Sequence, residues 1–100
     1  MKKRNIAFIQ LALKHGVSID YRMGHSRRTM LHTACRDGDI KKVIYLISQG
    51  ANLNIQDSQG STPLHLSIQP ISIFHSINII NKLIENGCKL NIQDKNGKTA

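Results

Sequence analysis

Three separate windows of the chain carry apolar residues at the spacing of one helix face. Apolar side chains stand at relative positions 0, 3, 6 and 7 of each window: Ile6, Ile9, Ala12 and Leu13; Ile40, Val43, Leu46 and Ile47; and Ile77, Ile80, Leu83 and Ile84. This spacing is typical of an amphipathic helix with one buried side. A glycine follows each window and can end the helix in the left-handed conformation: Gly16, Gly50 and Gly87. We therefore predict three helices, the last of them from about Ile77 to Asn86.

Shorter helices are predicted before the second and third windows. Thr29 and Thr62 stand where a threonine hydroxyl can cap the free backbone N–H groups of a starting helix. Pro63 suits the first helical position because it has no N–H to satisfy. The other expected roles are inward-pointing side chains at Leu31, Ala34 and Leu64, and N-caps of the longer helices at Asp39 and Ser76.

The chain also repeats itself. Thr29–His32 returns 33 residues later as Thr62–His65, and Gly50–Asp57 returns as Gly87–Asp94. Each copy of the second stretch leads into a turn-forming segment that ends in glycine. A repeat of this period is typical of a stack of small supersecondary units, which binds through its surface.

The repeated residues point to a known family. Thr62–His65 matches the T-P-L-H motif that marks a repeat of this length, and Gly50–Asn54 matches a second part of the same motif. On these residues the chain resembles the ankyrin-repeat family over nearly its whole length. The resemblance implies an all-α repeat solenoid, with stacked helix-turn-helix ankyrin units joined by β-hairpin-like fingers. It also implies that the chain holds other proteins and is not an enzyme.

On this pattern we expect one ankyrin-repeat domain over residues 1–100. It would consist of an N-terminal half-repeat (1–23), a repeat (24–56), a repeat with an inter-helix insertion (57–93) and the start of a truncated further repeat (94–100). A polar end cap, which a stack normally needs, is missing after that start. We therefore interpret the chain as part of a longer protein.

Two departures from the family pattern affect the predicted binding surface. In the first finger, Arg27 stands where the turn glycine is usual, and Asp20–Arg28 is one residue longer than Asn54–Ser61. We expect this finger to be irregular, with Gly24 taking the tight turn.

The second departure is an insertion between the paired helices of the second repeat. The segment Gln69–His75 is four residues longer than Arg36–Gly38, and Pro70 is expected to end the preceding helix. Three apolar side chains would then lie in a loop: Ile71, Ile73 and Phe74. They would either anchor a partner or fold back over the two helices.

Charge and composition limit the classes of partner that we expect. The net charge is +8, and residues 1–50 carry ten Lys or Arg against three acidic residues, whereas residues 51–100 carry four Lys against three acidic residues. The basic half favours an acidic partner surface. No apolar run approaches the roughly 20 residues that span a bilayer, and two cysteines are too few for a disulfide framework. We therefore expect no membrane partner and a cytoplasmic protein. Similarity to ankyrin proteins of large DNA viruses and intracellular bacteria adds the host-cell cytosol as a location and a host factor as a candidate partner.

The histidines and cysteines are expected to have structural roles. His32 and His65 hold the same phase in their units, so a structural role explains both: the imidazole would bond the capping threonine and a carbonyl of the neighbouring unit. Cys35 and Cys88 occupy positions for small apolar side chains. We expect no catalytic, metal or cofactor site.

The family resemblance places contacts on the finger tips and on the outward residues of each first helix, and the inserted loop adds Phe74 as a candidate anchor. Carried onto this chain, the protein-binding residues are Arg22, His25, Ser26, Arg28, Arg36, Asp37, Ser58, Gln59, Ser61, Gln69, Phe74, Lys95, Asn96 and Lys98. The leading hypothesis is a protein–protein interaction module that uses the finger tips and the concave helix face. The alternatives are a basic surface for nucleic acid, which scarce aromatic residues disfavour, and a targeting domain for an enzyme encoded downstream. The sequence does not set the oligomeric state.

Overall fold

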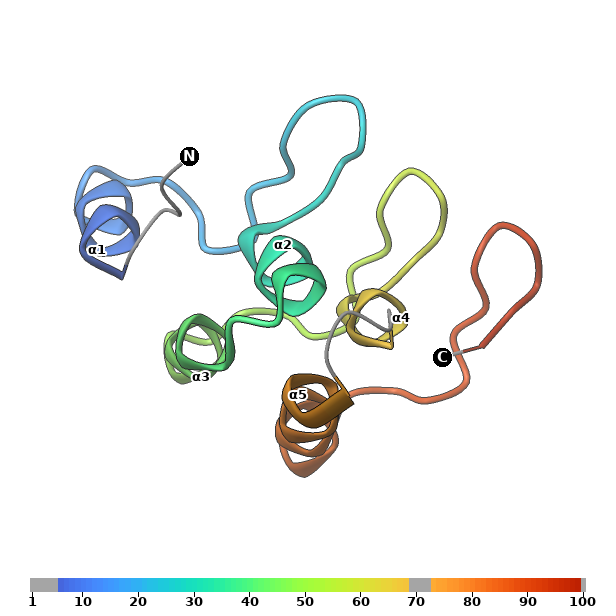
Figure 1. Ribbon diagram of the computed structural model, residues 1–100. Coiled ribbons are helices and arrows are strands. Elements are labelled where there is room, and N and C mark those ends of the chain that lie inside the picture. The colour runs from blue at the N-terminus through green and yellow to red at the C-terminus, as the bar shows by residue number, and fades with distance from the viewer. Residues whose placement is uncertain (1–5, 69–72, 100) are drawn as a thin grey trace.

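The computed structural model describes residues 6–68 and 73–99. Its helices form two rows (Figure 1): an inner row of α2 (Met30–Asp37) and α4 (Pro63–Ser67), and an outer row of α1 (Ile6–Lys14), α3 (Ile40–Ser48) and α5 (Ile73–Glu85). Three long loops project from the inner row to one side. We call them finger 1 (20–28), finger 2 (54–61) and finger 3 (91–98). The described residues contain no strand beyond one isolated antiparallel bridge, so the expected all-α repeat solenoid is confirmed.

The helix ends follow from short-range chemistry. Thr29 and Thr62 are N-caps with extended backbones, and each accepts a hydrogen bond from the N–H three residues on. Asp39 caps α3 in the same way, as predicted. At the other ends, Gly50 and Gly87 lie in the left-handed region, with φ of 85° and 86°, which explains why glycine closes these helices.

The core lies between the two rows. Leu31, Ala34 and Leu64 of the inner row are buried, as predicted, in one core cluster with Val43 and Leu46 of the outer row. Burying a leucine side chain stabilises a fold by about 1.5–3 kcal/mol, so these contacts hold the units together. No helix in ranges 6–68 and 73–99 is long and apolar enough to cross a bilayer.

The predicted inward face of α5 is partly wrong. Leu83 is buried, but Ile77 and Ile84 are 50% and 46% exposed, and Ile79 is buried instead. Apolar residues occupy more than one side of this helix, so spacing alone did not identify the buried side. The equivalent residues of α3 are partly covered because the next unit lies against them, whereas no further unit follows α5 in the described part of the chain.

The predicted start of α5 is also wrong. The helix begins at Ile73, one turn before the expected Ile77, so Ser76 lies inside it and is not the N-cap. Ile73 and Phe74 therefore belong to the first turn of the helix and not to a loop. No Gly or Pro interrupts this stretch, so the helix can extend toward its N-terminus. The inserted residues lengthen α5 to 13 residues, compared with 9 in α3.

The rest of the insertion cannot be compared with the prediction. Gln69, Pro70 and Ile71 lie outside the described residues, as does the placement of the Phe74 side chain. The helix α4 ends at Ser67, before Pro70 is reached.

Candidate protein-binding surface

Backbone hydrogen bonds join the tips of neighbouring fingers. The Ser58 N–H donates to the Ser26 carbonyl at 2.8 Å, and the Lys95 N–H donates to the Gln59 carbonyl at 2.8 Å. The two bonds occupy equivalent places in consecutive units. The fingers are therefore held side by side along the stack and are not independent loops.

Side chains add a second row of contacts near the base of the fingers. Arg22 Nη2 donates to the Gln56 carbonyl at 2.7 Å, and Gln56 Nε2 donates to the Gln93 carbonyl at 3.0 Å. Arg22 thus performs in finger 1 the task that Gln56 performs in finger 2. Its guanidinium therefore bonds the neighbouring finger, and the contact of Arg22 with a partner stays a prediction.

Histidines connect each inner helix to the next finger. The Thr29 N–H donates to His32 Nδ1 at 3.1 Å, so this nitrogen is an acceptor. His32 Nε2 lies 2.8 Å from the Ser61 carbonyl, which only accepts, so Nε2 carries the proton. His65 repeats the arrangement, with Thr62 on one side and the Lys98 carbonyl at 2.9 Å on the other. The predicted structural role of both histidines is confirmed.

Burial affects the protonation of His32. Removal from water lowers the pKa of this imidazole, although the bond to the Ser61 carbonyl and the nearby Asp57 act in the opposite direction. The neutral ring fits the contacts, because a proton on Nδ1 would face the Thr29 N–H. His32 is therefore a neutral structural link under physiological conditions.

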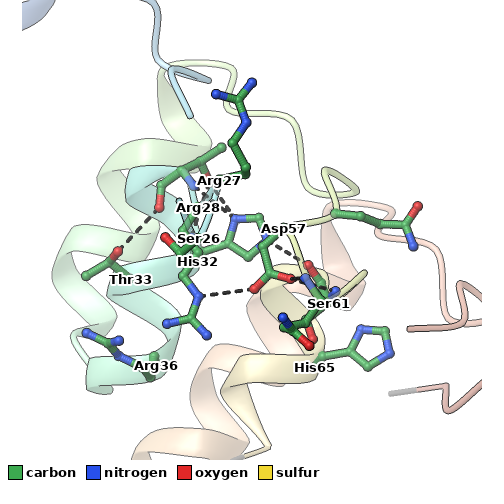
Figure 2. A network of polar contacts seen from close by, with 12 residues as sticks. Ser26, Arg27, Arg28, His32, Thr33, Arg36, Asp57, Ser61 and His65 are labelled. Atoms are coloured by element: carbon green, nitrogen blue, oxygen red, sulfur yellow. Dashed lines mark hydrogen bonds and ion pairs between the residues drawn. The ribbon is translucent and has the colours of Figure 1, made fainter. Parts of the chain in front are cut away.

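Asp57 organises finger 2 from within (Figure 2). Its Oδ1 accepts from the N–H groups of Gln59 and Ser61, both at 2.9 Å, and its Oδ2 accepts from Arg28 Nε at 3.1 Å. Burial alone would raise the pKa of Asp57, but these donors together hold it below its ordinary value. The carboxylate is therefore charged, and Arg28 is its partner from the preceding finger.

Asp94 repeats only half of this arrangement. Its Oδ1 accepts from the N–H groups of Lys98 and Asn96 at 2.9 Å, and these bonds, that from Lys98 first, lower its pKa. Ser61 stands where finger 1 has Arg28, so no arginine reaches Asp94. Finger 1 has Met23 in place of the aspartate, with a bridge from the Met23 N–H to the Arg28 carbonyl.

The predicted binding residues therefore fall into distinct groups. The backbone or side chain of several is used to hold the stack: Arg22, Ser26, Arg28, Ser58, Gln59, Ser61, Lys95 and Lys98. Lys95 and Lys98 are also exposed, as are the other residues of the fingers and the end of α2: His25, Arg36, Asp37 and Asn96. Arg36 and Asp37 pair with each other at 3.4 Å. Gln69 and the Phe74 side chain lie outside the described part.

One exposed residue of the fingers was not among those predicted to bind protein. Arg27 is exposed at the turn of finger 1, and its guanidinium makes no hydrogen bond or ion pair with other described residues. The signal was present in the sequence, because an arginine there replaces the turn glycine.

The potential metal ligands and the two cysteines can be placed in the described part of the chain. Within the described ranges, no three His, Cys, Asp or Glu side chains gather in a way that could hold a metal ion. Burial raises the pKa of the Cys35 and Cys88 thiols, so both stay protonated and unreactive.

Comparison with known proteins agrees with this architecture. Residues 1–94 match the family described as ankyrin repeats (3 copies). The chain is 35% identical to Rabankyrin-5 of Mus musculus over 69% of its own length, and 36% identical to the E3 ubiquitin-protein ligase HACE1 of Danio rerio over 55%. It is also 31% identical to the palmitoyltransferase AKR1 of Lachancea kluyveri over 75% of its length. The chain spans only 6%, 6% and 10% of these relatives, in the same order. Ankyrin repeats are non-catalytic modules of protein–protein interaction. The chain belongs to the ankyrin-repeat family.

Proposed function

We propose that this chain binds a partner protein through the tips of its three fingers and the adjoining exposed face of the inner helices. The observation that carries the proposal is a contrast between backbone and side chains. The finger backbones are bonded to one another through Ser26, Ser58, Gln59 and Lys95. The tip side chains of His25, Ser58, Lys95 and Asn96 are exposed and make no hydrogen bond within the described residues.

This contrast favours binding for an energetic reason. Ordering a flexible loop at an interface costs conformational entropy, and that cost reduces affinity. In this chain the finger-to-finger bonds and the Asp57 and Asp94 turns order the fingers before any partner arrives. The backbones of the tips then present their side chains to a partner from fixed positions.

The inserted segment joins the proposal only in part. Gln69 and Phe74 remain candidate contacts, because they follow the inner helix α4 closely along the chain. The longer α5 leaves fewer residues for the loop between α4 and α5 than we expected.

A second candidate function is the placement of an enzyme on its target. Two relatives have the printed names of an E3 ubiquitin-protein ligase and a palmitoyltransferase, and the chain matches a small part of each. In a longer protein of that kind, the repeats would hold a partner while another domain acts. A host protein is a candidate partner in either case.

The test is affinity capture with matched baits. One variant removes the tip side chains (His25→Ala, Ser58→Ala, Lys95→Ala and Asn96→Ala). A control variant removes four exposed side chains from the outer helices (Lys41→Ala, Ser48→Ala, Asn81→Ala and Glu85→Ala). Circular dichroism first establishes that both are folded. We expect the control to recover the same partner as the wild type and the tip variant to lose it. Recovery by the tip variant, or loss by the control, contradicts the proposal.

A further inference from the structure

The turns of the three fingers hold different residues in the same conformation. Gly60 and Gly97 have φ of 76° and 79°, and each donates its N–H to the backbone carbonyl of the aspartate that starts its turn, at 2.9 Å. Arg27 has φ of 56° and donates its N–H to the Met23 carbonyl at 3.1 Å, so it occupies the equivalent place. It is the one non-glycine residue with positive φ in the described part of the chain. Gly24, at 59°, also adopts positive φ, so finger 1 is irregular as expected, but the place of the turn glycine is held by Arg27 and not, as we predicted, by Gly24.

An arginine in this conformation is unfavourable, since the left-handed region suits glycine and few other residues. The structure of finger 1 holds it there from both sides. The Arg27 carbonyl accepts from Arg22 Nε at 3.3 Å, and the next residue closes the bridge to Met23. The backbone strain thus falls on a position that glycine would occupy without this cost. Retained strain of this kind points to a task for the side chain.

Sterics explain why finger 1 can accept a side chain where finger 2 cannot. A Cβ atom on Gly60 would lie 2.7 Å from the Lys95 nitrogen of finger 3. Arg27 carries its Cβ while the Ser58 nitrogen of finger 2 still bonds the Ser26 carbonyl at 2.8 Å. Finger 1, which is one residue longer, thus accommodates a side chain at its turn while keeping its bond to finger 2.

The Arg27 side chain is free to bind. Figure 2 shows its guanidinium directed away from Asp57, whereas Arg28 reaches that carboxylate. The carboxylates of the fingers already accept hydrogen bonds: Asp20 from the Asn52 N–H, Asp57 from Arg28 and its own turn, and Asp94 from its own turn. Arg27 on finger 1 and Lys95 on finger 3 are exposed and make no ion pair with other described residues, whereas Asp94 beside Lys95 is bonded by the N–H groups of its own turn.

We infer that the fingers bind a carboxylate-rich peptide segment. Arg27 forms a bidentate hydrogen bond with one carboxylate of the peptide, and Lys95 binds another. This inference rests on the proposed function and specifies the chemistry of its partner. A guanidinium matches the planar geometry of a carboxylate and gives the stronger class of hydrogen bond. A nucleic acid fits less well, because a phosphate chain calls for a continuous row of cations. The tip of finger 2 between the two cations, Ser58–Gly60, carries no charge.

The test compares probes and single substitutions by fluorescence anisotropy. The probe is a labelled peptide of alternating Glu and Ser, compared with a matched peptide of Gln and Ser and with a short DNA duplex, at low and physiological salt. The variants are Arg27→Gly, Arg27→Lys and Lys41→Gly, the last of which removes one exposed positive charge from the outer helix α3.

We expect the wild type to prefer the Glu peptide to both other probes. Arg27→Gly should weaken that binding by about tenfold and also raise the melting temperature, because the strain is relieved. Arg27→Lys should weaken binding to an intermediate degree, and Lys41→Gly should change it by less than about twofold, as a distant screened charge does.

Several results would overturn the inference: no preference for the Glu peptide, tighter binding of the duplex, equal losses in Arg27→Gly and Lys41→Gly, or unchanged binding in Arg27→Gly. These outcomes differ from failure of the proposed function. A protein partner that needs the finger tips but binds Arg27→Gly normally would leave the finger surface in place and remove only its acidic specificity.

Discussion

Asp57 and Asp94 offer a test of the contacts between units, because they have the same place in consecutive fingers and differ in one partner. Asparagine at position 57 keeps an oxygen for the N–H groups of Gln59 and Ser61 but replaces the oxygen that faces Arg28. That contact is 3.1 Å long, between side chains that are 1% and 26% exposed. A hydrogen bond to a charged group contributes about 1.5–3 kcal/mol, and the partial exposure of Arg28 places the loss at the low end, about 1.5–2 kcal/mol. Asp94→Asn has no arginine to lose and should cost less.

The assay is urea unfolding followed by circular dichroism at neutral pH, with the same denaturant slope for each protein. Arg28→Ala, alone and together with Asp57→Asn, completes a double-mutant cycle that isolates the pair. We expect a clear coupling energy between positions 28 and 57. Equal destabilisation by Asp57→Asn and Asp94→Asn, or a coupling energy near zero, would refute the argument that Arg28 and Asp57 link finger 1 to finger 2.

Three further results are expected. Leu64→Ala, at a site 3% exposed, should lower the free energy of unfolding by about 2–5 kcal/mol, whereas Ile68→Ala, at a site 48% exposed, should change it little; similar losses would contradict the core assignment. Gly60→Ala should cost at least about 1–2 kcal/mol in chemical unfolding, because its backbone is left-handed and its Cβ would meet Lys95; an unchanged midpoint would speak against this close approach. The pKa of His32 in the folded chain lies below 6.5, so the unfolded chain binds more protons in acid. The contribution of neutral His32 to the free energy of unfolding is therefore complete above pH 6.5 and is lost as the pH falls through the folded pKa. Urea unfolding at about pH 7.5 and about pH 5 should show this decrease, and His32→Gln should reduce it; an equally steep decrease in His32→Gln would assign the effect to other groups.

Much of the fold could be predicted because its signals are local. Threonine caps, Pro63 and the closing glycines act within a few residues of themselves, and the structure has them where the sequence placed them. The start of α5 could not be predicted in the same way. Ser76 looks like a cap, but the preceding residues can also continue a helix, and local propensity does not decide between the two.

The binding surface was less predictable, because the role of a finger residue depends on the neighbouring unit. Arg22 and Arg28 look like free cations in the sequence, but the stack brings them to the Gln56 carbonyl and to the Asp57 carboxylate. Those partners are 34 and 29 residues away along the chain. Arg27 is the opposite case, because its guanidinium bonds no neighbouring unit among the described residues. The sequence alone does not distinguish it from Arg22 and Arg28, and only the geometry of its turn does.

The measurement that tests the account most directly is amide hydrogen exchange in the free chain, at the tips of the fingers. The Ser58 and Lys95 N–H groups lie in exposed loops, yet each donates to the neighbouring finger at 2.8 Å. We predict that both amides exchange slowly, as helix amides do. The Gln56 N–H, which donates to no group of the described residues, should exchange fast and serves as the comparison within the same chain. Exchange of the Ser58 and Lys95 amides at the rate of an unstructured peptide would show that the fingers are independent, and would contradict a preformed binding row.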